Sequence, residues 1–478
     1  EPTSGRFGVL YAKEENRLLF SSNVFLFAFL PSVLLIYYLC PRRLRNPVLL
    51  LWSLVFYGWG EPVYLLLMIA TIVLNYLFGL WIHNRRQQGK CAKGVLAAGV
   101  AANLLILGFF KYTGFFITQL KALLPFMANV SVPEIALPIG ISFYVFQSMS
   151  YVIDVYRQDA PVQKNVLTFG TYVTLFPQLI AGPIVRYRDV AEQMDERREN
   201  IADFSSGVEL FIIGLGKKVL LANPMGQFWE LLQAHEGTAA AWVGIVAYTL
   251  QIYFDFSGYS DMARGLGRMF GFEFLENFNY PYISATVTEF WRRWHISLST
   301  WFKEYVYIPL GGNRKGLPRQ ILNLLVVWGL TGFWHGASWN FVLWGLYYAV
   351  LLIIEKLFLL KLLGKLPKFI GHIYAMVAVV LGWALFYFED ITRLGGFLGQ
   401  LFTPAAVTVQ GGNLILGYLP MLLISVVAAT PLLHALGVKL EGKAWSKWVK
   451  LALLAVVFLL CIAALASDSY NPFIYFRF

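Results

Sequence analysis

Charged residues are scarce in this 478-residue chain: they make up 14% of the sequence, whereas hydrophobic residues make up 58%. Soluble globular domains carry about 25% charged residues. A water-exposed fold of this composition would leave a large apolar surface in water, at a free-energy cost that grows with its area. The scarcity of charge therefore excludes an ordinary soluble domain and predicts an integral membrane protein.

Cysteines and common catalytic signatures are also scarce. The three cysteines, Cys40, Cys91 and Cys461, are scattered without CxxC spacing, so the sequence predicts neither a disulfide framework nor a metal site. It contains no GxSxG, HExxH, Walker A or HxxxD motif, and Gly258-Tyr-Ser-Asp261 matches a serine elbow only in part. These absences argue against a serine hydrolase of the soluble type.

The net charge of +11 comes from 38 Lys and Arg residues against 27 Asp and Glu residues. The basic residues form short clusters between apolar runs, and no basic stripe covers a domain. This pattern is typical of the cytoplasmic loops of membrane proteins. It argues against a nucleic-acid partner and predicts contact with membrane lipids instead.

The long uncharged runs predict an all-α polytopic membrane protein with about 11–13 transmembrane or re-entrant helices. The expected membrane segments are residues 18–41, 46–60, 62–84, 94–110, 135–153, 165–185, 237–254, 320–354, 369–388, 394–438 and 451–467. The basic clusters between them can all be placed in the cytoplasm without contradiction.

The chain start differs in composition from the rest. Residues 1–17 are polar and lack the hydrophobic stretch of a signal peptide, so we interpret them as a polar leader, either an upstream extension or an expression tag. No soluble domain or fixed-period repeat is evident. Residues 18–478 are therefore expected to form a single membrane domain.

The run of residues 320–354 holds 35 uncharged residues if its one histidine is neutral. A single helix of this length would be about 52 Å long, too long for a hydrocarbon core of about 30 Å. Two short helices with a turn near residues 336–340 fit better. Basic loops flank both ends, so the turn is expected to point toward the outer side, with His335 recessed below the surface.

His335 and His295 are the histidines that could carry chemistry. An ionisable side chain at membrane depth is costly and suggests function, and a neutral imidazole can take the proton from an attacking hydroxyl. For His335 the alternative is an interfacial residue in an aromatic belt with Trp334 and Trp339.

His295 lies in a segment whose large side chains recur at helical spacing, which predicts one helical face from Trp291 to Tyr305. Glu289 and Arg293 are spaced to pair on this helix. Two interpretations remain open: an amphipathic helix on the inner surface with His295 packed in its aromatic face, or a wall of an acyl-donor channel.

Three motifs resemble a known family: Trp291-Arg-Arg-Trp-His-Ile-Ser-Leu-Ser299, Tyr307-Ile-Pro-Leu-Gly-Gly-Asn-Arg314 and Gly332-Phe-Trp-His-Gly336. They are similar to the membrane-bound O-acyltransferase family, and most of all to its bacterial polysaccharide branch, typified by the membrane subunit of alginate O-acetylation. Further segments look like that branch: Phe20-Ser-Ser-Asn-Val-Phe-Leu-Phe27, Pro138-Ile-Gly-Ile-Ser-Phe-Tyr144, Phe176-Pro-Gln-Leu-Ile-Ala-Gly-Pro-Ile184, Phe254-Asp-Phe-Ser-Gly-Tyr-Ser-Asp261 and Pro472-Phe-Ile-Tyr-Phe-Arg-Phe478. The resemblance covers essentially residues 18–478.

The resemblance implies an O-acyltransferase in which His335 is the catalytic histidine and His295 the second characteristic polar position. It implies helices around a central tunnel, acetyl-CoA as a cytoplasmic acyl donor, no bound cofactor and no metal. It further implies a multi-pass protein of the bacterial inner membrane. Its expected partners are an extracytoplasmic SGNH-type O-acetyltransferase and a polysaccharide export and modification complex.

Several other residues are candidates for lining the substrate channel: Trp294, Trp334, Asn340, Arg292, Arg293 and Asn313. Among them, the arginines could attract CoA phosphates, or could simply follow the positive-inside rule. Asn340 or the neighbouring Ser338 is a candidate for hydrogen bonding the developing oxyanion.

Two rival functions remain. The D-alanine branch of the same family acylates teichoic acid from a carrier-protein thioester, so it would require a carrier protein. A passive transporter or scaffold would need no histidine chemistry. The few carboxylates within the apolar runs weigh against a proton-coupled transporter, since Asp154 and Asp255 only border such runs.

Overall fold

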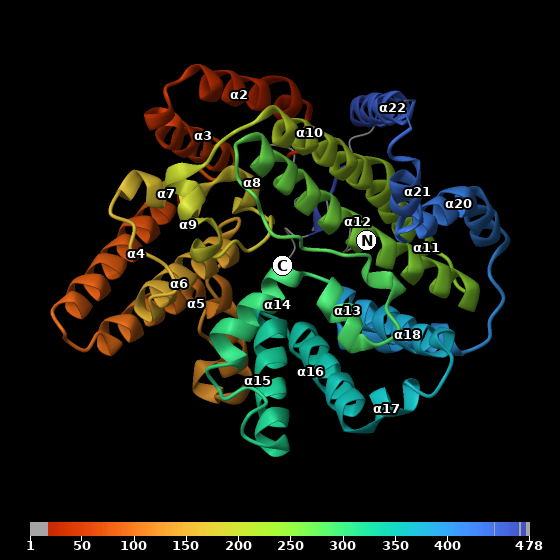
Figure 1. The fold of residues 1–478 in the computed structure, drawn as a ribbon. Coiled ribbons are helices and arrows are strands. Elements are labelled where there is room, and N and C mark those ends of the chain that lie inside the picture. The colour runs from red at the N-terminus through yellow and green to blue at the C-terminus, as the bar shows by residue number, and fades with distance from the viewer. Residues whose placement is uncertain (1–17, 444, 468–469, 475–478) are drawn as a thin grey trace. The chain divides into compact units, whose positions relative to one another are not determined.

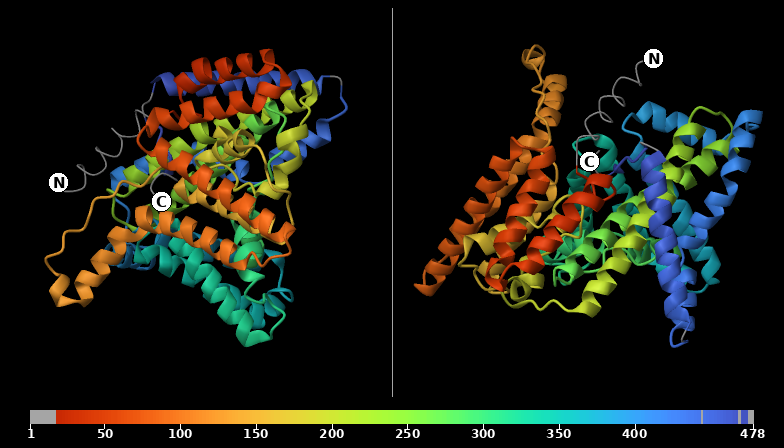
Figure 2. Two further views of the ribbon diagram at one scale, coloured as in Figure 1. Left: turned by 90° about the vertical axis from the view of Figure 1, so that its left-hand side faces the viewer. Right: turned by 90° about the horizontal axis from the view of Figure 1, so that it is seen from above.

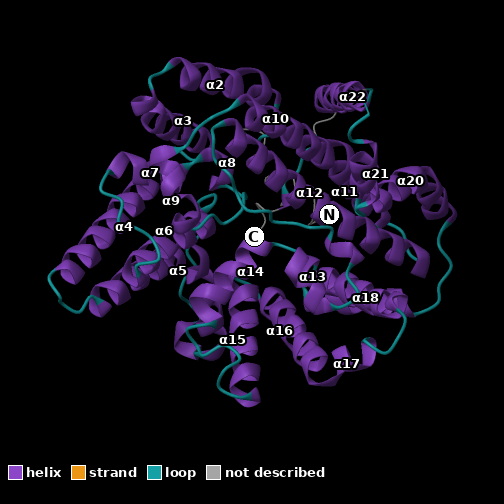
Figure 3. Ribbon diagram, viewed as in Figure 1, coloured by secondary structure: helices purple, strands orange, loops and turns teal. Residues whose placement is uncertain are grey.

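The computed structural model describes residues 18–443, 445–467 and 470–474. These residues form helices joined by turns and loops, and no β-strand occurs among them (Figure 3). The all-α class predicted from the sequence is therefore confirmed. The expected polar leader, residues 1–17, lies outside the described residues.

The chain divides into two compact units. The first consists of the residues up to Phe211 together with Met262–Leu275, and the second consists of Ile212–Asp261 and Glu276–Phe478. The long helix α12 (Thr238–Met269) starts in the second unit, and its C-terminal end belongs to the first. That residues 18–478 act as a single membrane domain stays a prediction.

The helices of the first unit follow one another along the chain (red to yellow in Figure 1). They are η1 (Phe25–Phe29), α2 (Leu30–Leu39), η2 (Arg42–Leu44), α3 (Arg45–Gly60), α4 (Tyr64–Gln87), α5 (Lys93–Leu123), η3 (Pro125–Met127), α6 (Ile141–Arg157), α7 (Val166–Thr174), α8 (Phe176–Leu179), α9 (Tyr187–Glu196) and α10 (Ile201–Gly216), the last of which ends in the second unit.

Helix α6 lies at the centre of one bundle in this unit, beside α4 and α5 (orange to yellow in Figures 1 and 2). Nearly all of its side chains are buried. A reciprocal amide pair joins α4 to α5: Asn75 Nδ2 lies 3.1 Å from Asn103 Oδ1, and Asn103 Nδ2 lies 2.7 Å from Asn75 Oδ1. Such a pair satisfies two polar side chains that would be costly to leave alone between apolar helices.

The second unit contains the remaining helices (green to blue in Figure 1). Besides α12 they are η4 (Lys217–Ala222), α11 (Asn223–Leu232), η5 (Pro281–Ile283), α13 (Val287–Arg293), α14 (Ile296–Phe302), η6 (Lys303–Tyr307), α15 (Leu317–His335), α16 (Trp339–Ile354), η7 (Glu355–Leu359), α17 (Leu360–Leu363), α18 (Lys368–Tyr387), α19 (Ile391–Phe402), α20 (Val409–Ala428), α21 (Leu432–Leu440) and α22 (Ser446–Ser467).

Six of the described helices are long and apolar enough to cross a membrane: α4, α5, α12, α18, α20 and α22. Helix α22 has the highest mean hydropathy of the six, 2.8, and its window is only 6% buried within the protein. An apolar surface this exposed is stable only in a lipid environment. The chain is therefore a multi-pass membrane protein, as its composition predicts.

Two expected segments do not form single helices. The run 165–185 forms α7 and α8 because the backbone leaves the helical region at Leu175 and Pro177 has no N–H to continue the ladder. The run 394–438 falls largely within α19, α20 and α21, with interruptions that contain Pro404 and Pro431. Short helices of this kind were included in the sequence prediction as re-entrant segments.

Candidate active site around two buried histidines

The predicted hairpin of residues 320–354 is confirmed. Helix α15 ends at His335, helix α16 begins at Trp339, and the two lie side by side (Figure 1). Glycine allows this close approach. A Cβ on Gly332 would lie 2.1 Å from the Phe341 carbonyl oxygen, and one on Gly345 would lie 2.2 Å from the Trp328 carbonyl oxygen.

His335 occupies the last position of α15 and is 6% exposed. Three aromatic rings surround its imidazole at nearly right angles: Trp334 at 5.0 Å, Trp344 at 5.0 Å and Phe386 at 5.4 Å between ring centroids. These rings come from α15, α16 and α18. The enclosure holds the imidazole in one place and limits the access of water to it.

Asn340 fastens the start of α16 to the end of α18. Its Nδ2 donates a hydrogen bond of 3.1 Å to the carbonyl oxygen of Phe386, whose ring flanks His335. Its Oδ1 is buried and has no hydrogen-bond partner among the described residues, and the same holds for Nε1 of Trp344. Buried polar atoms without partners are rare and often mark a functional site.

His295 lies at a break between α13 and α14, and the structure corrects the expected continuous helical face here. The His295 backbone takes a left-handed conformation with φ of 44°. The loop before α13 replaces the lost helical hydrogen bonds: Asn279 N–H bonds to the Arg293 carbonyl at 2.9 Å, and Ile296 N–H bonds to the Asn277 carbonyl at 3.0 Å. Periodicity did not reveal the break because its cause lies in another segment.

The side chain of His295 is almost completely enclosed, at 1% exposed. Its Nδ1 lies 3.1 Å from Oδ1 of Asn277, and its ring packs edge-on against Phe256 at 4.7 Å. His295 is outside the six candidate spans. Burial lowers the pKa of His295 to about 3, so its imidazole is neutral at physiological pH.

Trp334 lies close to both histidines. Its ring centroid is 6.2 Å from that of His295 and 5.0 Å from that of His335. Trp294 extends the cluster, because its ring lies 4.8 Å from Trp383, which in turn lies 6.2 Å from Trp344. The structure thus brings His295, His335, Trp294, Trp334 and Asn340 into one buried aromatic cluster within the second unit.

Three expected channel residues lie differently. Arg292 and Asn313 are exposed, and Arg293 is half-buried. Arg293 pairs with Glu289 at 3.0 Å, as its spacing predicts, and donates to the Asn279 carbonyl at 3.1 Å. Within the part of the chain that the structure describes, no hydrogen bond or ion pair joins any of these three residues to either histidine.

Two polar residues of the site had no signal in the sequence pattern. Asn277 is 1% exposed and Glu355 is fully buried. Glu355 accepts hydrogen bonds from the backbone N–H groups of Val287 at 2.6 Å and Thr288 at 2.8 Å, which caps the start of α13. In the sequence, Glu355 is simply the charged residue that follows the uncharged run of residues 320–354. Asn277 lies in a polar loop that has no periodic pattern.

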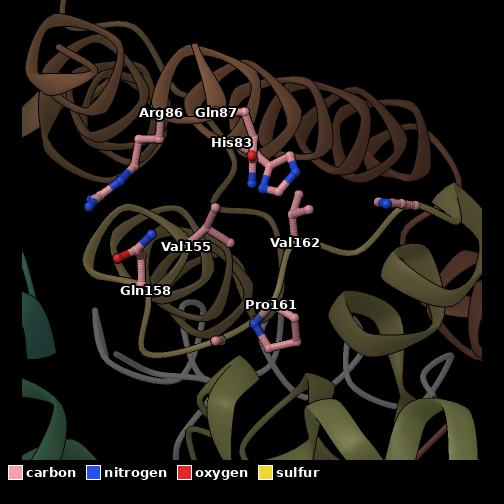
Figure 4. Close-up of a pocket in the computed structure, with 9 residues that line it drawn as sticks. His83, Arg86, Gln87, Val155, Gln158, Pro161 and Val162 are labelled. Carbon is pink, nitrogen blue, oxygen red and sulfur yellow. The ribbon is translucent and has the colours of Figure 1, made fainter. Parts of the chain in front are cut away.

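A separate cavity of about 540 Å³ lies in the first unit (Figure 4). Basic and amide side chains share its wall with small apolar ones, and neither candidate histidine is among them. The lining residues are His83, Arg86, Gln87, Val155, Gln158, Ala160, Pro161, Val162 and Lys164. Among the described residues no group of three His, Cys, Asp or Glu side chains is placed to hold a metal ion.

The fold and site define a polytopic, all-helical membrane protein with two buried histidines in one aromatic enclosure. Residues 157–394 match the family model described as MBOAT, membrane-bound O-acyltransferase family. The chain is 39% identical to a protein of Pseudomonas putida described as "Probable alginate O-acetylase AlgI", over 96% of this chain and 100% of the relative. An Azotobacter vinelandii protein with the same description is 40% identical over the same shares.

This chain therefore belongs to the membrane-bound O-acyltransferase family and is an O-acyltransferase. A peptidoglycan O-acetyltransferase of Helicobacter pylori is 35% identical over 78% of each chain. A teichoic acid D-alanyltransferase of Bacillus subtilis is 28% identical, over 46% of this chain and 59% of the relative.

Proposed function

We propose that this protein moves an acetyl group from a cytoplasmic thioester, acetyl-CoA, across the bacterial inner membrane for O-acetylation of a secreted or cell-surface polysaccharide such as alginate. The choice of acetyl group and acceptor rests on the two relatives described as probable alginate O-acetylases, which match over 96% of this chain. D-Alanyl transfer to teichoic acid is the weaker alternative, because that relative matches 46% of the chain.

One observation carries the mechanism: Trp334 joins His335 and His295 in a single buried cluster. His335 acts as the general base. Its imidazole takes the proton of the acceptor hydroxyl while the hydroxyl oxygen bonds to the thioester carbonyl carbon. The carbon–sulfur bond then breaks, and the thiolate takes the proton that His335 had gained, so that it leaves as a thiol and the imidazole returns to its neutral form.

Asn340 and Trp344 are proposed to contact the reacting groups. The hydroxyl has a single hydrogen, which goes to His335, so the buried carbonyl oxygen of Asn340 would instead accept a hydrogen bond from an N–H of the acyl donor, while the buried indole N–H of Trp344 can donate to a carbonyl oxygen. A donor placed where negative charge develops lowers the barrier to acyl transfer. In the complex with substrate, both atoms would then have a hydrogen-bond partner, which neither has among the described residues.

The route across the membrane follows from charge. The positive-inside rule places the hairpin turn and His335 toward the outer side, and His295 toward the inner side, with a central tunnel between. The exposed residues Arg292, Lys303 and Arg314 would attract the phosphates of the donor at the cytoplasmic entrance. Outside the cell, an SGNH-type O-acetyltransferase within a polysaccharide export and modification complex would receive the acetyl group.

The test uses purified protein in lipid vesicles. Labelled acetyl-CoA is supplied on one side, and label is measured on the polysaccharide acceptor, with and without the extracytoplasmic partner. We expect transfer from acetyl-CoA, and none from a carrier protein loaded with D-alanine. Transfer from the D-alanine carrier, and none from acetyl-CoA, would support the D-alanine alternative. Acetyl transfer to peptidoglycan and not to alginate would show that the acceptor is peptidoglycan.

Replacing His335 tests the mechanism. His335→Ala should abolish acetyl transfer, a loss of at least about 100-fold because a general base contributes this much. His434→Ala is the matched control, because His434 is exposed on α21. Both variants should elute as folded protein in detergent. Full transfer by His335→Ala would contradict the proposed role of this residue.

A further inference from the structure

The side-chain oxygen of Asn277 meets three buried polar groups at the break between α13 and α14. It lies 3.1 Å from the Ser297 backbone nitrogen, 2.9 Å from the Ser297 hydroxyl oxygen and 3.1 Å from Nδ1 of His295. Asn277, His295 and Ser297 are 1%, 1% and 3% exposed. Water therefore does not compete for these contacts.

The Ser297 backbone fixes which way the Asn277 amide points. A backbone N–H can only donate a hydrogen bond, so the Asn277 atom that faces it must be the carbonyl oxygen. The same oxygen faces Nδ1 of His295. Because this oxygen can only accept, Nδ1 must carry the hydrogen.

A neutral imidazole has a single N–H, and the bond made by one ring nitrogen sets the state of the other. His295 is neutral at physiological pH because burial lowers its pKa to about 3. With the hydrogen on Nδ1, the lone pair resides on Nε2. The ring therefore presents an acceptor, not a donor, at that edge.

The backbone of Asn277 strengthens this arrangement. Its carbonyl oxygen accepts the Ile296 N–H at 3.0 Å, so its main chain and side chain together hold residues 295–297. The left-handed backbone at His295 is kept by these bonds and not by a glycine. The helix break thus positions the ring and selects its tautomer at the same time.

We infer that Asn277 is a positioning residue that fixes His295 in the tautomer protonated at Nδ1, so that His295 acts through Nε2 as a hydrogen-bond acceptor. The consequence for catalysis rests on the proposed acetyl transfer. An acceptor edge cannot supply the proton that the leaving thiolate needs, so this proton transfer is left to His335. The two histidines then have separate roles: His335 moves the proton, and His295 is a fixed hydrogen-bond acceptor in the aromatic cluster.

Nitrogen NMR of protein labelled with ¹⁵N-histidine measures the tautomer directly, without substrate. The signals of His295 are identified by their loss in His295→Gln. We expect a protonated Nδ1 and an unprotonated Nε2 in the unaltered protein. A His295 protonated at Nε2 would overturn the inference, whether or not the protein transfers acetyl groups.

Variants of the same site test the role of Asn277. Asn277→Asp keeps an acceptor oxygen and should keep the tautomer. Asn277→Leu removes the acceptor and should give a mixture of tautomers, with kcat lowered at least about tenfold, as for residues that orient a functional histidine. Ser297→Ala is the matched control: it removes one donor to the same oxygen, leaves the His295 contact, and should change neither property.

A merely structural role for Asn277 makes a different prediction. Asn277→Leu would then lower the melting temperature while the His295 signals stayed those of a single Nδ1-protonated ring, and this result would overturn the inference. If Asn277→Leu does not fold, the unaltered protein and Asn277→Asp still decide the question by their spectra.

Discussion

His295 and His335 reach similar burial by different routes. His335 is placed by its own helix, as the last residue of α15, and is enclosed by rings from α15, α16 and α18. His295 depends on Asn277, which lies 18 positions earlier in the sequence. A substitution near one histidine should therefore act mainly through helix packing, and a substitution near the other through a loop.

The burial of His295 predicts a pH dependence of stability. The unfolded chain binds a proton at this residue near pH 6.5, whereas the folded protein does so only near its pKa of about 3. Stability is therefore fully present above about pH 6.5 and falls as the pH is lowered toward 3. Between pH 7 and pH 5 the loss should be about 2 kcal/mol.

Thermal unfolding in detergent, followed by tryptophan fluorescence, checks this prediction. His295→Gln removes the titrating group, so its melting temperature should fall less between pH 7 and pH 5 than that of the unaltered protein. Equal losses in the two proteins would show that His295 does not contribute to the acid sensitivity.

At the scale of elements, the hairpin α15–α16 depends on glycine where the two backbones meet. The carbonyl oxygens of Phe341 and Trp328 occupy the positions that side chains on Gly332 and Gly345 would need. The motif that contains His335 is thus partly a packing motif. A side chain at Gly332 would meet the backbone of Phe341, and a side chain at Gly336 would meet its ring.

Gly345→Ala should force the two helices apart. The added Cβ would lie 2.2 Å from the Trp328 carbonyl oxygen, which belongs to a helix backbone and cannot turn away. We expect a loss of about 1–3 kcal/mol in unfolding free energy, together with lower acetyl transfer because His335 shifts. The melting temperature and the initial rate measure the two effects.

Gly329→Ala on the same helix is the control for this experiment. Among the described residues, no atom outside the adjoining part of its own helix lies within 4 Å of the position its Cβ would occupy, and alanine favours a helix over glycine by up to about 1 kcal/mol. It should therefore be neutral or stabilising. A loss equal to that of Gly345→Ala would contradict the packing explanation.

A buried ion pair ties the tail of the chain to the second unit. Lys218 Nζ lies 2.7 Å from Asp255 Oδ1, and both side chains are 3% exposed. Lys218 also donates to the Pro472 carbonyl, and Asp255 Oδ2 accepts the Ile474 N–H at 2.8 Å. Asp255 thus lies inside α12, not at the border of a helix as its place in the sequence predicts, and it belongs to a buried structural network.

Asp255→Ala should cost about 3–5 kcal/mol, because it leaves a buried lysine without its countercharge. Asp159→Ala is the control, since the pair Arg188–Asp159 lies outside the candidate spans, is 3.5 Å apart and has side chains 22% and 41% exposed. We expect a loss of about 1 kcal/mol or less there. Similar melting temperatures for the two variants would contradict the assigned difference.

At the scale of the whole molecule, charge clusters and apolar helices together set the topology. Helix α4 is a candidate span of 24 residues that ends in the basic stretch around Arg85 and Arg86. The positive-inside rule predicts that this end lies in the cytoplasm and the Val63 end outside. Because the proposed function requires a donor and an acceptor on opposite sides, this assignment is central to it.

Cysteine labelling tests the topology at the two ends of α4. Cys91 is exposed near the basic end, and Val63, 76% exposed, lies just before the other. In protein without Cys40 and Cys461, a membrane-impermeant maleimide should label Cys91 only from the cytoplasmic side. In Val63→Cys without Cys91, it should label only from outside. Labelling of each cysteine from the opposite side would show that the true topology is the inverse of the one assigned here.

The sequence by itself determined the class of this protein. Hydrophobic composition and the positions of charges decide which segments can lie in lipid, and neither depends on tertiary contacts. Scarce charge required a lipid environment, and the uncharged run of residues 320–354 predicted the hairpin that carries His335. Motif resemblance selected His295 and His335, but it could not place the two histidines relative to each other.

Only the tertiary structure decided how those residues are held. The helix break at His295, the cap from Glu355 and the contact with Asn277 join segments that are distant in sequence, so no periodicity within one segment reveals them. Tertiary structure also decided how deeply these residues are buried, and the free energy of a buried histidine or carboxylate depends on the groups that surround it in space. The surroundings of these groups, including the tautomer of His295, exist only in the folded protein.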